Sequence, residues 1–160
     1  MRYIFIITFF LSNFLFSKEL KIIADAFDTD QTKGISIFEG HVSIIKKNDE
    51  LNASKVTIYT DAKNQPTKFI ALGDVSFKIL TKEGARYRGT AGKVIYLPEK
   101  KEYYFYTNVY LKQIDKKKEI LGDEVILNVI TGEAHAKGLK KEPVIMIFNI
   151  ADDSNQEEKK

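Results

Sequence analysis

One strand-like phrase recurs along this chain and limits what it can fold into. It runs from Phe38 to Ile44 (FEGHVSI), from Ala71 to Phe77 (ALGDVSF) and, more weakly, from Phe105 to Leu111 (FYTNVYL). A second phrase follows each copy as ASKVTI, AGKVIY and GDEVIL, and ADAF around Asp25 looks like an opening copy of it. The repeat unit is roughly 30 to 38 residues, or two to three strands. The pattern predicts an all-β, antiparallel fold of repeated hairpins.

Each copy also alternates apolar and polar residues, which is typical of a strand with one buried face. The apolar faces together predict a groove with an apolar interior, and the alternative is the core of an ordinary closed sandwich. The residues that we expect to line the groove are Phe38, Val42, Ile44, Val56, Ile58, Phe69, Val75, Phe77, Val94, Tyr96, Val109, Leu111, Val125 and Leu127.

Gly40 and Gly73 occupy matching positions on the apolar face of the first two copies. Glycine inside a strand marks a bulge, a bend or a close approach of two backbones. The glycines allow two interpretations: a simple bulge, or a bend that curls the sheet around a shared interior.

Composition and charge exclude several classes of protein. The 160 residues suffice for one domain, and the formal net charge of +3 is too mild for a dedicated nucleic-acid binder. There is no cysteine, so neither disulfides nor a lipid anchor on cysteine can be present. Phe and Tyr, with 11 and 8 copies, suit a pleated sheet.

The two ends of the chain differ from the middle in composition. Residues 1–17 have a short positive start, an apolar run and a small residue, Ser17, which predicts a signal peptide and export to the periplasm. Leu15 is larger than is usual three positions before a cleavage site, so an uncleaved anchor is the alternative. We expect residues 18–150 to form the domain and residues 151–160 to be a disordered charged tail.

Polar clusters mark the expected turns, beginning with residues 28–34. The last expected strand, Val144–Ile150, is almost entirely apolar and lies near the end of the chain. A strand of this kind favours pairing with another chain. Lysine clusters in the turns are interpreted as solvated hairpin tips, with attraction to anionic lipid head groups as the alternative.

The residues provide no convincing catalytic or metal-binding set. His41 and His135 fall at polar positions of their strands, which favours solvated surface residues over a base or a ligand. Asp25 and Asp123 share one position of the second phrase, and they are interpreted as turn residues that bond backbone amides rather than as an acid pair. We therefore expect no enzyme, no metal and no cofactor.

The segments IAD at Ile23–Asp25, FEGHV at Phe38–Val42 and LNASKV at Leu51–Val56 together resemble the LptA, or OstA-like, family of periplasmic lipopolysaccharide transport proteins. The likeness runs from about Leu20 to Phe148. The family phrase has Gly-Asn-Val, and only Asn108 keeps the asparagine here, because His41 and Asp74 replace it. The resemblance implies a β-jellyroll, or open β-taco, of about sixteen antiparallel strands with an apolar interior.

The resemblance also implies a function. The interior would take the acyl chains of lipid A and leave the sugars outside. Domains would join head to tail, so Ile22 and Ala24 at one edge would meet Ile145 and Ile147 of the next copy. The assembly would connect an inner-membrane LptC-like anchor to an outer-membrane LptD-like translocon, with no nucleic-acid partner. The alternatives are a membrane-anchored LptC-like component and a polymerising structural β protein that binds no lipid.

Overall fold

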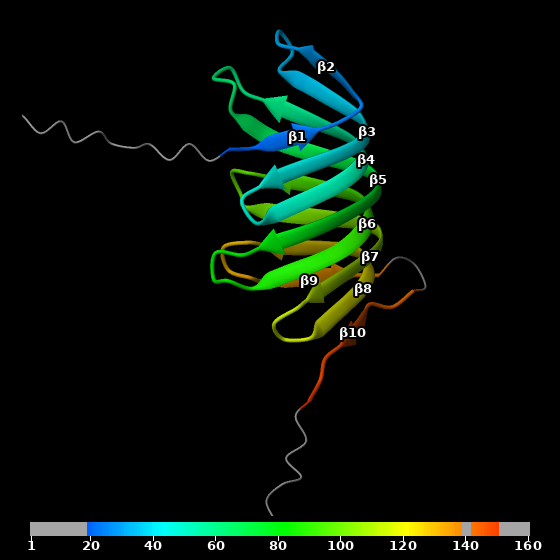
Figure 1. The fold of residues 1–160 in the computed structure, drawn as a ribbon. Helices are drawn as coiled ribbons and strands as arrows, with labels where there is room; N and C mark the ends of the chain where they lie inside the picture. Colours follow the sequence, from blue (N-terminus) through cyan, green and yellow to red (C-terminus); the bar gives the residue numbers. More distant parts are fainter. Residues whose placement is uncertain (1–18, 139–141, 151–160) are drawn as a thin grey trace, which may run out of the picture.

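The computed structural model describes residues 19–138 and 142–150, which form one antiparallel sheet of ten strands (Figure 1). The expected all-β antiparallel fold is therefore confirmed. The strands are β1 (Lys21–Ile23), β2 (Ala26–Asp30), β3 (Ile35–Lys46), β4 (Asp49–Thr60), β5 (Pro66–Leu80), β6 (Arg86–Leu97), β7 (Glu102–Gln113), β8 (Lys118–Asn128), β9 (Ala134–Lys137) and β10 (Ile145–Ile147). The expected signal peptide, residues 1–17, and charged tail, residues 151–160, lie outside the described residues.

Consecutive strands pair in chain order from β3 to β8, and short strands complete both edges of the sheet. At one edge β1 and β2 both pair with β3, and at the other edge β9 and β10 both pair with β8. Each edge therefore has a row of two short strands: the β1–β2 row, whose strands are separated by Ala24–Asp25, and the β9–β10 row.

The recurring phrase of the sequence is a bulge that bends the sheet. The pairing register shifts at this point in β3, β5 and β7, and two consecutive residues there have left-handed backbone angles. The pairs, with their φ angles, are Gly40 (78°) and His41 (45°), Gly73 (81°) and Asp74 (47°), and Thr107 (68°) and Asn108 (51°). Bulges increase the local twist and bend of a strand. The two interpretations of the glycines therefore describe one feature, here called the bend.

The bend divides the sheet into two layers that face each other. The first layer holds β2, β9 and the halves of β3–β8 that pair with them, such as Ile35–Glu39. The second layer holds β1, β10 and the other halves, such as Val42–Lys46. Counting both halves of the six long strands with the four short strands gives sixteen segments. This explains why ten strands are observed where the resemblance implied about sixteen.

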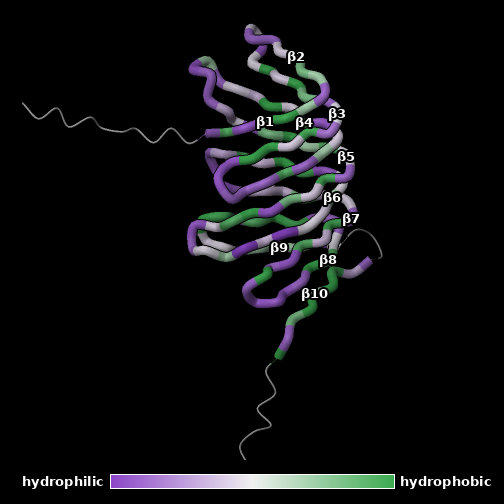
Figure 2. The backbone as a smooth tube through the Cα atoms, viewed as in Figure 1, coloured by the Kyte–Doolittle hydropathy of each residue, from purple (hydrophilic) through white to green (hydrophobic). Residues whose placement is uncertain are grey.

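The hydrophobic core lies between the layers. Phe77 of the second layer and Phe105 of the first layer pack with ring centroids 4.4 Å apart. Val56, Val75 and Val125 are fully buried. Apolar and polar residues alternate along the strands, and the hairpin tips on the left of Figure 2 are largely hydrophilic.

Two local expectations need correction. Residues 28–34 are not one turn, because Asp28–Asp30 extend β2 and pair with Ile35–Ile37. The last strand is β10, only Ile145–Ile147, rather than Val144–Ile150. As a separate finding, the described residues include no helix with the length and apolar character that a membrane crossing would require.

Candidate functional site

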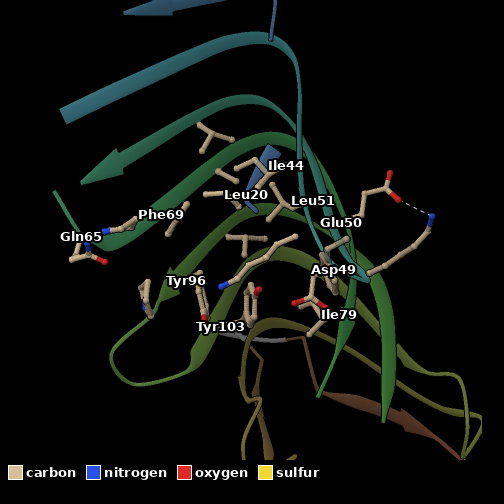
Figure 3. A pocket seen from close by; sticks show the side chains of 18 residues that line it. Leu20, Ile44, Asp49, Glu50, Leu51, Gln65, Phe69, Ile79, Tyr96 and Tyr103 are labelled. Carbon is tan, nitrogen blue, oxygen red and sulfur yellow. Dashed lines mark hydrogen bonds and ion pairs between the residues drawn. The ribbon is translucent and has the colours of Figure 1, made fainter. Parts of the chain in front are cut away.

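An apolar cavity of about 440 Å³ lies between the two layers on the β3 side of the sheet. Figure 3 shows Ile44 and Leu51 facing Phe69 and Tyr96 across this space. The second layer contributes residues of β3, β4 and β5, and the first layer contributes residues of β4 to β7. A cavity of this size lies within the range of small-molecule binding sites, which is about 300–1,000 Å³.

The fourteen residues expected to line the groove all lie in the interior, but they divide into two sets. Those that line the cavity are Ile44, Val56, Phe69, Phe77, Val94 and Tyr96. Those that pack elsewhere in the hydrophobic core are Phe38, Val42, Ile58, Val75, Val109, Leu111, Val125 and Leu127. A continuous groove along the whole sheet stays a prediction. On the β7–β8 side, Val109, Leu111, Val125 and Leu127 pack in the hydrophobic core.

Several residues that line the cavity are not among those that the sequence pattern led us to expect there. Leu51, Ile79 and Tyr103 lie two residues from inward-facing neighbours in β4, β5 and β7, so alternation alone could have identified them. Leu20 precedes β1, and Asp49 begins β4 next to a polar turn. No periodic pattern marks these last two positions.

Charged side chains also line the cavity. The Asp49 carboxylate accepts a 2.8 Å hydrogen bond from the Leu80 N–H. Partial burial raises the pKa of Asp49, although this hydrogen bond and nearby Lys46 act in the opposite direction. The ammonium group of Lys78 forms a 2.9 Å ion pair with Glu50 on the side away from the labelled aromatic rings (Figure 3). The cavity therefore has a mainly apolar lining that includes a few charged side chains.

Aromatic rings form one wall of the cavity. Tyr96 and Tyr103 stack with centroids 4.3 Å apart, and Tyr96 also packs against Phe69 at 6.0 Å. Burial raises the pKa of Tyr103, and the negative charge of Asp49 adds to this effect. Both phenols are thus neutral at physiological pH, and the wall carries no charge.

The two histidines and the two aspartates singled out in the sequence lie apart from the cavity, and the two aspartates lie apart from each other. The side chain of His41 is 92% exposed, and its Nδ1 lies 2.6 Å from Asp25 Oδ2 at the bend. His135 is exposed in β9. Asp123 lies in β8, which β4–β7 separate from the Asp25 edge, so the two carboxylates do not form an acid pair. The expected role of Asp25 is wrong in detail, because its carboxylate contacts a histidine ring.

The residues expected at the oligomer edges lie in the outermost rows of the sheet. Ile22 in β1 and Ala24 beside it pack partly against the core. Ile145 and Ile147 in β10 are each 49% exposed. Among the residues that the structure describes, no cluster of His, Asp and Glu could hold a metal ion.

Comparison with known proteins relates this geometry to a family. The family model for the LPS transport protein LptA and the N-terminal domain of LptD matches residues 21–133. The crystal structure of LptH, the LptA-homologous periplasmic component of the lipopolysaccharide transport device of Pseudomonas aeruginosa, superposes with a TM-score of 0.72. That match has 12% identity and covers 83% of this chain and 96% of LptH. No curated protein sequence matches. The chain belongs to the family of LptA and LptD N-terminal-domain LPS transport proteins.

Proposed function

We propose that this protein is a periplasmic carrier of lipopolysaccharide that holds acyl chains of lipid A between the two layers of its sheet. The observation that carries the proposal is the apolar, aromatic-walled cavity between the layers, in a chain of a family of LPS transport proteins. The residues around it bind by burial rather than by reaction, so the proposed role is transport and not catalysis.

The physical basis is the removal of hydrocarbon from water. Each buried methylene group contributes about 0.8 kcal/mol. The lining of the cavity is mostly apolar and aromatic, with a few charged side chains such as Lys46 and Asp49 among it. Acyl chains would occupy the interior, while phosphates and sugars would stay in solvent near the rim.

The proposed assembly is head to tail. The β1–β2 row and the β9–β10 row each leave one side unpaired in the described sheet. Antiparallel or parallel pairing between these rows of successive copies would extend the sheet and place the cavities in line. An LptC-like anchor at the inner membrane and an LptD-like translocon at the outer membrane would be the partners at the two ends.

A substitution that fills the cavity tests the proposal. Leu51 is half-buried and lines the cavity, so Leu51→Trp should occupy space that an acyl chain would use. Displacing two methylene groups costs about 1.6 kcal/mol, which corresponds to roughly tenfold weaker binding. We expect this loss when fluorescent lipopolysaccharide is titrated into the folded variant.

The matched control is Ile70→Trp. Ile70 lies in β5 between the inward-facing residues Phe69 and Ala71, so its side chain projects from the outer face. This control should bind like the wild type. Equal affinity in all three proteins would place the lipid elsewhere, and a wild type that binds no lipopolysaccharide would favour a structural β protein.

A further inference from the structure

Two turns from opposite layers meet across the open side of the sheet, far from the bend. One is the β5–β6 turn of the second layer (residues 81–85), and the other is the β8–β9 turn of the first layer (residues 129–133). The Lys82 N–H donates a 2.9 Å hydrogen bond to the Val129 carbonyl oxygen. The Tyr87 hydroxyl, at the start of β6, lies 3.5 Å from the Gly132 carbonyl oxygen. These two turns are here called the clasp.

The β5–β6 turn is held in shape by its own hydrogen bonds. The N–H of Thr81 donates to the Ala85 carbonyl oxygen at 2.9 Å, and the N–H of Ala85 donates to the Thr81 hydroxyl at 3.0 Å. Thr81 is only 3% exposed, although it lies in a turn. A polar residue that is buried in a turn indicates that another segment covers it, and the β8–β9 turn does so.

The β8–β9 turn is equally ordered by local bonds. The side-chain oxygen of Asn128 accepts hydrogen bonds from the N–H groups of Ile130 and Thr131, at 2.9 and 3.1 Å. Each turn can therefore keep its shape when the two separate, and only the contacts between them would be lost.

The clasp borders the cavity. Ile79 lines the cavity and lies two residues before Thr81. On the other layer Tyr103 lines the cavity, and the Val129 N–H donates a 2.9 Å hydrogen bond to the carbonyl oxygen of nearby Lys101. The clasp thus stands between the cavity and the β9–β10 edge. On its far side the interior is filled by core residues such as Leu111 and Leu127.

We propose that the clasp holds the two layers together on the β9–β10 side of the cavity and opens when lipid leaves the cavity toward that edge. The inference rests on the proposed function and adds a regulated closure to the same site. The closure is slight, because it consists of one short hydrogen bond, one at 3.5 Å and the packing beneath them. The two layers are joined far more firmly at the bend, by continuous chain.

A reversible crosslink tests the clasp, and the chain has no native cysteine to interfere. A direct backbone hydrogen bond joins Lys82 and Val129, so a short crosslink can connect side chains at these two positions. The test variant is Lys82→Cys with Val129→Cys, closed by oxidation or by a short bismaleimide. The control is Ser76→Cys with Thr90→Cys, a register pair within the second layer.

Each protein is loaded with fluorescent lipopolysaccharide in the reduced state, crosslinked, and then mixed with excess unlabelled wild type. We expect the closed clasp variant to hand over lipid at least tenfold more slowly, to recover when the disulfide is reduced, and to bind palmitate as the wild type does. The control should transfer at the same rate in both states. Equal transfer rates before and after closure of the clasp variant would overturn the proposal.

Amide hydrogen exchange separates this proposal from the function on which it rests. In the protein without lipid, the Lys82 amide should exchange at least tenfold faster than the hydrogen-bonded amides of β5 and β6, since the clasp would open locally. Protection equal to that of these strands would rule out local opening, whether or not lipopolysaccharide binds. Fast exchange in a wild type that binds no lipopolysaccharide would refute the proposed function, and with it the clasp's role in lipid release, but not the local opening itself.

Discussion

The bend depends on which residues tolerate a left-handed backbone. At its second position the three copies have His41, Asp74 and Asn108, with φ angles between 45° and 51°. Asn, Asp and His are the residues other than glycine that occur most often in this region. The departures from the family asparagine are therefore conservative, because they preserve a backbone angle rather than a side-chain function.

The first position of the bend follows a different rule, which is contact with the neighbouring strand. A Cβ atom on Gly40 would collide with the side chain of Asp25, and one on Gly73 would lie 2.7 Å from Ser54 Oγ. The third copy reverses the roles, because Thr107 occupies this position and a Cβ on Gly92 opposite would lie 3.0 Å from its Cβ. Every such contact includes one glycine, which explains why the third copy of the phrase looks weak.

At the residue scale, the pair of His41 and Asp25 makes stability depend on pH. The hydrogen bond and the charge of Asp25 raise the pKa of His41 above its ordinary value of 6.5. A raised pKa in the folded state gives stability that is fully present below 6.5 and is lost as pH rises through the raised value. Asp25→Asn should therefore lower the His41 pKa toward 6.5, as measured by NMR titration with the His135 ring signals as internal reference.

Urea unfolding of the same two proteins gives a second measure. As pH rises from about 6.5 through the raised pKa of His41, the wild type should lose more stability than Asp25→Asn. The difference should be small, because both side chains are largely exposed to solvent. An unchanged His41 titration in the variant would show that the 2.6 Å contact does not persist in solution.

At the element scale, the bend in β5 should be sensitive to a single methyl group. Gly73→Ala adds a left-handed alanine, which costs about 1–2 kcal/mol, and a contact with Ser54 that the strands must relieve. Gly84→Ala is the control, since its φ is 89° and a Cβ there would meet nothing within 4 Å. We expect Gly73→Ala to lose about 1 kcal/mol more free energy of unfolding than Gly84→Ala in urea. If both variants lose the same free energy of unfolding, β4 and β5 can move apart at the bend without an energetic cost.

The inward face of most strands could be predicted from the sequence, but the exact ends of the edge strands could not. Alternation identified the inward face of β3, β5 and β7, and glycine in a strand indicated the irregularity at Gly40 and Gly73. The extension of β2 through Asp28–Asp30 was missed, because polar residues on an edge strand look like a turn. The shortness of β10 was missed for the opposite reason, since Val144 and Phe148 are as apolar as the strand between them.

At the scale of the whole molecule, local sequence patterns cannot predict which side chains meet across the two layers. Alternation cannot tell that Phe77 meets Phe105 across the layers, because they lie in different strands and do not pair in register. The cavity and the clasp arise from the way in which the layers face each other. Asp49 and Lys82 therefore had no signal in the sequence, although both lie next to the cavity or its boundary.

Exposed apolar side chains along the β9–β10 row predict that copies of this protein associate with one another. Met146 and Phe148 are 53% and 52% exposed at the edge of the sheet. A lysine on an edge strand opposes pairing with another chain, so Met146→Lys should weaken association by about tenfold, or about 1.4 kcal/mol. Thr90→Lys, on the exposed face of the central strand β6, is the control and should associate like the wild type.

Sedimentation velocity over a concentration series measures both variants. The wild type and Thr90→Lys should form longer species as concentration rises, because each added copy leaves a new free edge. Met146→Lys should stay largely monomeric over the same range. If Met146→Lys associates as strongly as Thr90→Lys, the copies do not join through β10. The carrier would then need another surface to bring successive cavities into line.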